Sequence, residues 1–320
     1  MDRLVKQLLA LIVALSLSPM ANAYDFKVGD LAYNFVAGDS SKVFVTYTSI
    51  YTNQNDPDLT NYYGITEVNI PATVKYKGKT RTVTGLTDEA FHSSSIETLK
   101  LPSTIKYIGE RAFHGCYELK RVDIGSLEQW LNIEFVLGSG TIYTTHSTPL
   151  SYNAVLYVNN KQLEDVVIPA SITTIKTLAL YHWTWMKSVK LHKNVKIIEK
   201  SAFYEFDHLE AVIVPDIETW INLETHCNPL QFAKHLYIND KEVKNLVVPV
   251  NVSELPSGVF QNCLSIESVT FHRKFTTIGA SAFRGCKNLT SVTIPYSVTD
   301  IQNMAFYTCD NLSTVYLERY

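Results

Sequence analysis

One short pattern of apolar residues recurs at a fixed spacing near the end of the chain. Its copies begin at Val243, Ile266, Leu289 and Leu312, and each start lies 23 residues after the one before. In the copy LTSVTI, as in the others, the first, fourth and sixth residues are apolar and the rest are mostly polar. A fixed period in the twenties with this strand-like pattern is typical of a solenoid, in which every repeat forms one coil of a stack.

Each copy has the properties of a short strand with one buried face. Its fourth and sixth residues keep the alternation of a strand that turns one side towards a core. A proline, which lacks the N–H that a continuing strand needs, often follows the pattern, at Pro102, Pro169, Pro215, Pro249 and Pro295. A coil of 23 residues cannot bury its apolar residues alone, so coils must stack. We therefore expect strands on one side of the stack and turns or short irregular segments on the other.

The pattern continues back through most of the chain at a less even spacing. The longer gaps contain a basic hairpin-like insertion at residues 75–81 and two irregular coils near 125–162 and 215–242. Each irregular coil opens with a tryptophan, Trp130 or Trp220, for which we expect a short helical turn with the indole packed inward. No linker divides the repeats, so residues 61–320 are predicted to form one solenoid. The starts lie at Ile65, Ile96, Leu119, Leu163, Met186, Leu209, Val243, Ile266, Leu289 and Leu312.

Residues 24–60 lack the repeat and are predicted to form an N-terminal β cap. Two strand-like segments, 33–36 and 43–47, flank a turn-forming stretch that begins at Gly38. A terminal coil would otherwise expose its apolar face to water, so covering that face is the expected role of this segment. The polar stretch 52–61 is expected to be a loop.

Residues 1–23 have the three parts of a secretory signal peptide. Arg3 and Lys6 precede an apolar run of about ten residues, and an A-x-A site ends at Ala23, so the mature chain is predicted to begin near Tyr24. The apolar run is too short to span a membrane comfortably, and no second span follows it. We expect an exported chain without a transmembrane anchor, whether it is secreted, periplasmic or held at the cell surface.

The charge balance argues against a nucleic-acid partner. The full chain has a formal net charge of −3, and removing Asp2, Arg3 and Lys6 with the signal peptide takes away a net +1 and leaves −4. Nucleic-acid binding needs a basic surface that neutralises phosphates, and a mildly acidic chain has no such electrostatic footprint.

Four of the five cysteines share one slot of the repeat. An Ala-Phe-x-x-Cys phrase places Cys116, Cys263, Cys286 and Cys309 at equivalent positions, with Val259 in place of alanine before Cys263. A ladder of small buried thiols is the preferred interpretation, although an exported protein also permits disulfides between adjacent coils. The fifth, Cys227, falls outside this ladder.

No motif of an enzyme, a metal site or a cofactor site stands out in the sequence. G-x-S-x-G, H-E-x-x-H, P-loop and C-x-x-C patterns are absent, and adjacent carboxylates at Glu164 and Asp165 are expected on a solvated strand face. His92 and His114 share one turn position in neighbouring coils. They are either part of an exposed column of free identity or a two-histidine site that binds a metal or senses pH.

A cluster of aromatic residues breaks the repeat in two consecutive coils. Trp183 and Phe206 occupy the inward cysteine slot, and Leu180 replaces the usual phenylalanine. Four other residues fall on positions that are polar in other coils and form the candidate binding surface: Tyr181, Trp185, Tyr204 and His208. Exposed aromatic residues on a rigid scaffold favour contact with protein or sugar. Alternatively, the irregular coils fold over this surface through Tyr143, Tyr152 or Tyr157.

The phrase from Phe275 to Pro295, FTTIGASAFRGCKNLTSVTIP, resembles the BspA-type leucine-rich repeat of bacterial surface and secreted proteins. The resemblance implies a mainly β, right-handed leucine-rich-repeat coil stack, and members of that family are associated with adhesion to host extracellular proteins and cells. We therefore expect a non-enzymatic binding or adhesion protein whose ligand is a host extracellular matrix protein or glycoprotein. The alternatives are a secreted carbohydrate-binding or hydrolytic accessory protein and a structural envelope scaffold.

Overall fold

The computed structural model describes residues 24–48, 62, 64–137, 147–204, 206 and 208–318. The chain divides into two compact units, residues 1–162 and 163–320, which are described one after the other. The predicted signal peptide and the predicted loop 52–61 lie outside the described residues, so both stay predictions.

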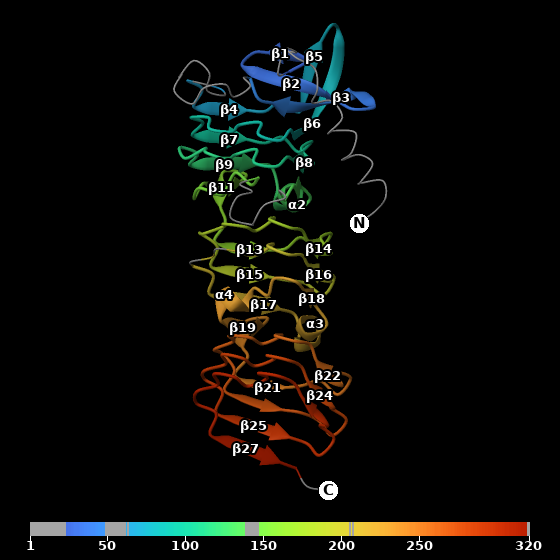
Figure 1. Cartoon of the computed structure of the whole chain (residues 1–320), viewed down its shortest axis with the longest axis vertical. Coiled ribbons are helices and arrows are strands. Elements are labelled where there is room, and N and C mark those ends of the chain that lie inside the picture. The colour runs from blue at the N-terminus through green and yellow to red at the C-terminus, as the bar shows by residue number, and fades with distance from the viewer. Residues whose placement is uncertain are drawn as a thin grey trace. The chain divides into compact units, whose positions relative to one another are not determined.

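The first unit contains a parallel ladder built from the recurring apolar pattern. Strands β4 (Glu67–Asn69), β7 (Thr98–Lys100), β9 (Arg121–Ile124) and β11 (Val155–Val158) lie side by side, and β12 (Lys161–Gln162) pairs antiparallel with β11. Figure 1 shows these strands stacked one below another. The first three strands each begin two residues after a predicted start, which confirms the pattern.

A second sheet in the same unit joins the N-terminal segment to the coils. Strands β1 (Phe26–Val28), β2 (Leu31–Val36) and β3 (Asp39–Thr46) are antiparallel, and β3 then pairs in parallel with β6 (Lys79–Leu86). The parallel order continues through β8 (Tyr107–Ile108) to β10 (Glu134–Phe135). Strand β5 (Thr73–Tyr76) pairs antiparallel with β6, which confirms the hairpin predicted at residues 75–81.

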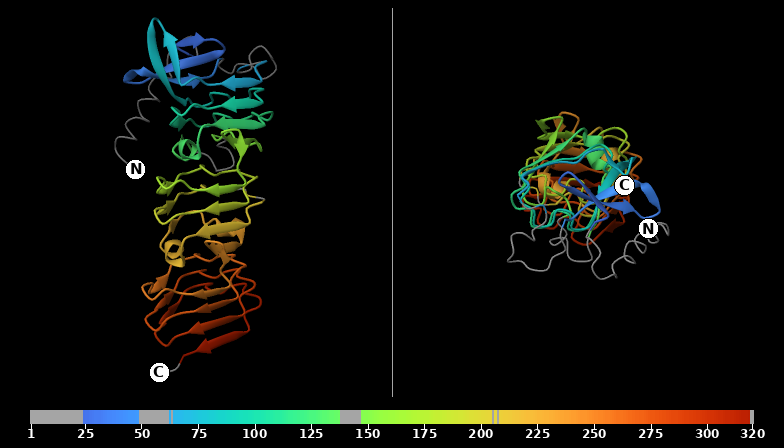
Figure 2. Two further views of the ribbon diagram at one scale, coloured as in Figure 1. Left: turned by 180° about the vertical axis from the view of Figure 1, so that it is seen from behind. Right: turned by 90° about the horizontal axis from the view of Figure 1, so that it is seen from above.

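The second unit also contains parallel strands, which form two successive sheets on the side of the recurring pattern. On one side β13 (Asp165–Val167), β15 (Ser188–Lys190), β17 (Ala211–Val214) and β19 (His235–Ile238) are parallel, and β20 (Lys241–Glu242) turns back against β19. A further parallel sheet follows, with β21 (Asn245–Val247), β23 (Ser268–Thr270), β25 (Ser291–Ile294) and β27 (Thr314–Leu317). The left view of Figure 2 shows the coils of this unit stacked in order.

The other side of the coils is more regular than the sequence predicted. Instead of turns or irregular segments, two-residue strands form short parallel ladders in the second unit. In four of these six strands the second residue, Ile278 for example, is buried, whereas Thr225 is half-buried and Ile301 is 48% exposed. These strands are β14 (Thr174–Ile175), β16 (Ile197–Ile198), β18 (Glu224–Thr225), β22 (Glu254–Leu255), β24 (Thr277–Ile278) and β26 (Asp300–Ile301).

The Ala-Phe pair forms the plug that holds consecutive coils together. The rings of Phe260 and Phe283 stack at 5.4 Å between centroids, and those of Phe283 and Phe306 stack at 5.4 Å with an interplanar angle of 2°. Main-chain bonds follow the same column, because Phe283 N donates to Ala305 O at 2.8 Å. Stacked rings add to the energy of burial, so each coil aligns the next.

Both irregular coils contain the predicted helical turn. Helix α2 (Leu127–Leu131) is capped by Ser126, and α3 (Ile217–Ile221) by Asp216. Each carries a fully buried indole, and Trp220 Nε1 donates to the carbonyl of Val259 at 3.0 Å. A third short helix, α4 (Leu230–Ala233), follows α3 and was not predicted.

The four cysteines of the shared slot are buried free thiols, as the sequence indicated, and Cys227 is a free thiol that is only partly buried. Cys286 and Cys309 each donate through sulfur to a carbonyl of the preceding coil, Phe260 O and Phe283 O, at 3.1 Å. Burial raises the pKa of Cys116 and of Cys263 to about 11. Cys227 differs from the prediction, because its thiol also donates to a phenylalanine carbonyl of the preceding coil, that of Phe203.

Candidate binding surface

We define the aromatic surface as Tyr181, Trp185, Tyr204 and His208, the four residues singled out by sequence, all within the second unit. Tyr181 and Tyr204 lie in neighbouring coils with their rings stacked at 5.8 Å and an interplanar angle of 6°. Tyr181 also packs on His182 at 5.4 Å and is only 5% exposed, so the expectation of an exposed Tyr181 is wrong. Its ring serves as a support for Tyr204 rather than as a contact of its own.

Trp185 and His208 occupy equivalent positions three residues before paired strand residues, Ser188 and Ala211. In two regular coils this slot holds an asparagine that bonds to the coil before it, and in the coil that begins at Ile266 it holds Ser265. Asn288 Nδ2 donates to Leu264 O at 2.8 Å, and Asn311 Nδ2 donates to Lys287 O at 2.7 Å. Among the described residues, neither Trp185 nor His208 forms such a bond to the coil before it. Trp185 is 46% exposed and His208 is exposed as well, as the sequence predicted.

The outward face of the adjacent sheet adds a column of three apolar or aromatic side chains and one lysine that sequence reasoning missed. Register aligns Val167, Lys190, Ile213 and Tyr237 on β13, β15, β17 and β19. Val167 is 61% exposed, although an outward strand position is polar in most copies of the repeat. The signal was present in the sequence, because a valine stands at the fifth place of the copy that begins at Leu163.

The tyrosines proposed as a cover have partners within the first unit. Tyr152 packs on Tyr117 with ring centroids 4.8 Å apart, and its hydroxyl accepts from the amide of Gly115. Tyr157 carries the guanidinium of Arg121 at 3.9 Å from its ring centroid. Tyr143 lies outside the described residues.

His92 and His114 lie side by side in the first unit, as their spacing predicted. Their rings stack at 4.8 Å, and His114 Nδ1 lies 3.1 Å from His92 Nε2. Arg111 Nη2 donates to the same His92 nitrogen at 3.3 Å. Burial and then the Arg111 charge lower the pKa of both histidines. A cation beside the pair also opposes a metal ion, and no group of three or more metal-ligating side chains occurs among the described residues.

The neighbouring carboxylates Glu164 and Asp165 point to different partners. Glu164 pairs with Lys187 at 2.5 Å, and Asp165 accepts from the hydroxyl of Ser188 at 2.6 Å. They therefore do not converge into an acid–base pair, in agreement with the sequence-based interpretation. Within the part of the chain that the structure describes, no helix is long and apolar enough to cross a membrane.

Comparison with known proteins identifies the repeat. A family model for the BspA type leucine rich repeat region matches residues 60–136, 153–228 and 230–319, in six copies. The chain belongs to the BspA-type leucine-rich-repeat family. Proteins of this family are typically non-enzymatic binding proteins of the bacterial surface. No curated protein sequence matches the chain.

Several solved structures are similar to this chain. A leucine-rich cell surface protein from Faecalibacterium prausnitzii is 17% identical, with 95% of this chain and 96% of that chain covered and a TM-score of 0.46. A leucine-rich repeat protein from Bacteroides ovatus is 23% identical, with 92% and 77% covered and a TM-score of 0.47. The pneumococcal vaccine antigen PcpA is 14% identical, with 94% and 100% covered and a TM-score of 0.32.

Proposed function

We propose that the mature chain is an exported, non-enzymatic binding protein that holds an extracellular protein on the aromatic surface. The observation that carries this proposal is the exposed indole of Trp185, in a slot where asparagine elsewhere bonds to the neighbouring coil. A half-exposed tryptophan loses apolar contact with water when a partner covers it, and tryptophan and tyrosine are enriched among the residues that dominate binding energy.

The scaffold beneath this surface is suited to binding. Tyr204 rests on the buried ring of Tyr181, and Trp185 and His208 lie on adjacent coils that strand pairing aligns. A rigid surface loses little conformational entropy on association, which favours affinity. The neighbouring Val167 extends the apolar area on the sheet face.

The proposed setting is outside the cytoplasm. The signal-peptide pattern of residues 1–23 supports export, and family membership supports a place at the cell surface and a role in protein interaction. A host extracellular matrix protein or glycoprotein is the proposed partner, and adhesion is the proposed outcome. A carbohydrate is the second candidate, because the exposed indole of Trp185 also offers a flat apolar face to a sugar ring.

Residues 24–320 should be screened against immobilised host matrix proteins and a glycan array. We expect saturable binding to a protein, weakened about tenfold or more by Trp185→Ala, with a smaller loss for His208→Ala. Tyr296→Ala is the matched control, because Tyr296 is also 46% exposed but lies in a different coil. Circular dichroism checks the fold of each variant.

The outcomes separate the candidates. Loss of protein binding in Trp185→Ala but not in Tyr296→Ala supports the proposal. Binding to glycans alone moves the carbohydrate reading ahead. Protein binding that survives Trp185→Ala would exclude the aromatic surface as the site.

A further inference from the structure

The two ladders of the first unit differ at the end nearest the N-terminal segment. On one side β3 pairs in parallel with β6, so the ladder continues into the antiparallel strands β1–β3. On the other side β4 is the last strand of its sheet and pairs only with β7 among the described residues. Within the described part of the chain, one ladder therefore continues into further strands, and the other ends in an open edge.

The free main-chain groups on this edge can be assigned from the hydrogen bonds of β4. Thr66 O accepts from Thr98 N, and Ile70 N donates to Lys100 O, each at 3.0 Å. Successive residues of a strand direct these groups to opposite sides, so Thr66, Val68 and Ile70 face β7. The amides and carbonyls of Glu67 and Asn69 consequently face the open edge. An unpaired edge of this kind is a template for another strand.

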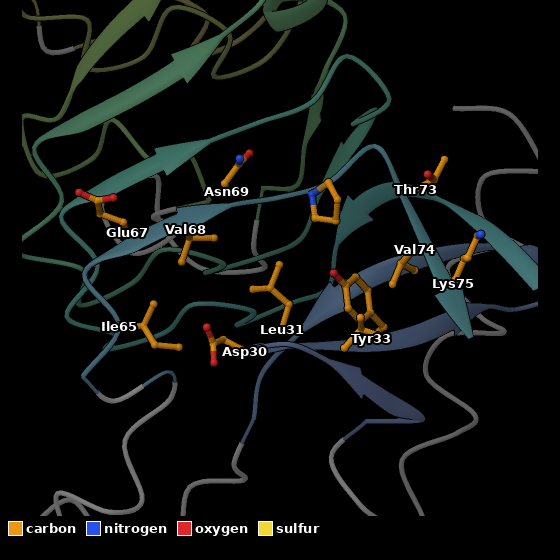
Figure 3. Close-up of a pocket in the computed structure, with 12 residues that line it drawn as sticks. Asp30, Leu31, Tyr33, Ile65, Glu67, Val68, Asn69, Thr73, Val74 and Lys75 are labelled. Carbon is orange, nitrogen blue, oxygen red and sulfur yellow. The ribbon is translucent and has the colours of Figure 1, made fainter. Parts of the chain in front are cut away.

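A cleft of about 390 Å³ lies against this edge (Figure 3). Leu31 and Val68 project into its middle, with Ile65, Asp30 and Glu67 towards one end and Thr73 and Lys75 towards the other (Figure 3). The volume falls within the range of about 300–1,000 Å³ that is common for ligand sites. The middle of the cleft is apolar, and both ends are charged.

The charges at the two ends have opposite sign. Asp30 and Glu67 are exposed carboxylates that form no ion pair with any cation among the described residues, and Lys75 is likewise without an ion pair there. A ligand with a positive charge near Asp30 and an apolar group over Val68 would complement this arrangement.

We propose that the cleft binds an extended peptide segment of another protein, which adds to β4 as a further strand. Its main chain pairs with Glu67 and Asn69, an apolar side chain packs between Leu31 and Val68, and a basic side chain lies near Asp30. β4 has three residues, and a strand rises about 3.3 Å per residue, so three to four residues of the peptide would pair. Addition of a strand to an open edge is an established mode of peptide recognition. This site is separate from the aromatic surface.

The test uses the amide of Asn69, which can be removed without loss of a bond to β7. Asn69→Pro deletes this N–H at an edge position where proline is tolerated, whereas Asn69→Ala removes only the side chain. Peptides would be selected on the folded chain, residues 24–320, from a random ten-residue phage-displayed library. Synthetic copies of the selected peptides would then be titrated against each variant.

We expect selected peptides to carry a basic residue, to bind the wild type and Asn69→Ala alike, and to bind Asn69→Pro at least tenfold more weakly. Asp30→Asn with Glu67→Gln should reduce the preference for basic peptides, and Trp185→Ala should leave it unchanged. Hydrogen exchange should show the amides of Glu67 and Asn69 becoming protected only when peptide is added.

Four results would overturn the proposal. The first is the absence of any selected peptide, and the second is equal binding of the peptides to the wild type and to Asn69→Pro. The third is protection of the Asn69 amide in the monomer without peptide, which would mean that another part of the same chain already pairs with the edge. The fourth is a dimer in analytical ultracentrifugation that Asn69→Pro dissociates, which would make a second copy of the chain the occupant.

Discussion

The coils around Trp183 and those around Cys286 use the same positions of the repeat in different ways. In the regular coil, Phe283 fills the interior, the thiol of Cys286 donates to the coil before it, and Asn288 does the same from the surface. In the aromatic coil, the corresponding residues are Leu180, Trp183 and Trp185. Leu180 and Trp183 remain buried, whereas Trp185 is exposed.

This comparison separates two kinds of position. The inner slots are constrained by volume, so a smaller plug at Leu180 is accompanied by a larger group at Trp183. The outer slot is constrained only by one side-chain hydrogen bond, such as that of Asn288. A coil can therefore replace this asparagine with a side chain that binds a partner, and the cost in stability is modest. Function can therefore appear on the outer slots without a change of fold.

The largest expected effect on stability comes from replacing Trp183 with cysteine, the residue that the regular coils have at this inner position. Trp183→Cys leaves a cavity beside Leu180, and loss of a buried tryptophan side chain typically costs about 3–5 kcal/mol. We expect the free energy of unfolding to fall by about 3 kcal/mol, because the thiol can recover one hydrogen bond while the Trp183 Nε1–H has no partner among the described residues. Urea denaturation followed by circular dichroism measures this change.

The double variant Trp183→Cys/Leu180→Phe sharpens the result. If the two slots share one volume, the added phenylalanine should restore part of the lost stability, although Leu180→Phe alone overpacks the coil. Additive losses in the double variant would contradict the idea that the slots compensate for each other.

A second prediction concerns how closely neighbouring coils approach in the regular region. A Cβ at Gly279 would lie 2.3 Å from the carbonyl oxygen of Leu255, which is backbone and cannot move alone. In the aromatic region the same slot holds Glu199, which accepts from Thr177 N at 2.8 Å. We expect Gly279→Ala to cost about 2 kcal/mol in thermal or urea unfolding. Glu199→Gln, which keeps the acceptor, is the control, and an equal loss in both variants would refute the difference in coil approach.

Much of the fold was predictable because each buried residue recurs at a fixed position of the repeat. The strand starts, the indoles of Trp130 and Trp220 and the four slot thiols were all found in this way. The second ladder was missed because a strand as short as Thr277–Ile278 leaves no period to detect. Cys227 was placed outside the ladder because no Ala-Phe-x-x-Cys phrase precedes it, although its thiol reaches the same kind of carbonyl.

The sites were less predictable than the fold. The exposure of Trp185 and His208 was predicted from the sequence, but the burial of Tyr181 depends on its stack with Tyr204, which spacing alone does not specify. The cleft beside β4 was not found, because it joins Leu31 to Val68 through the pairing of β3 with β6. Such contacts between segments of different pattern carry no periodic signal.

A third prediction tests whether the residue at the outer slot contributes to the stability of the fold. Asn288→Ala removes the bond to Leu264 O, and loss of a partly exposed hydrogen bond should cost about 1 kcal/mol. Among the described residues, Trp185→Ala removes no such bond between coils, so we expect a change within about 0.5 kcal/mol. Parallel urea titrations of the two variants measure the difference. If Trp185→Ala lowered the free energy of unfolding more than Asn288→Ala does, Trp185 would be a structural residue and would not be available for binding.

The smallest expected effect concerns one turn position of the repeat, which holds different residues in the two units. His92 stacks on His114 in the first unit, and Tyr181 stacks on Tyr204 in the second. Burial and Arg111 hold the pKa of both histidines below the value of about 6.5 that they have in an unfolded chain. The unfolded chain therefore binds more protons as the pH falls through 6.5, and the native state loses stability in that direction. The contribution of the pair is present above pH 6.5 and is lost as the pH falls through the folded values.

We expect the urea midpoint to fall between pH 7.5 and pH 5.5 in the wild type, and to fall less in His92→Tyr/His114→Tyr, which copies the stack of the second unit. Glu89, which lies 3.7 Å from Arg111, is retained in both chains and keeps the local charge on Arg111 partly balanced. Partial desolvation raises the pKa of Asp88, whose contribution opposes the histidine effect because it stabilises the native state as the pH falls, but Asp88 too is common to both chains. If the urea midpoint shifts equally in the wild type and in the double variant, protonation of His92 and His114 is not coupled to folding.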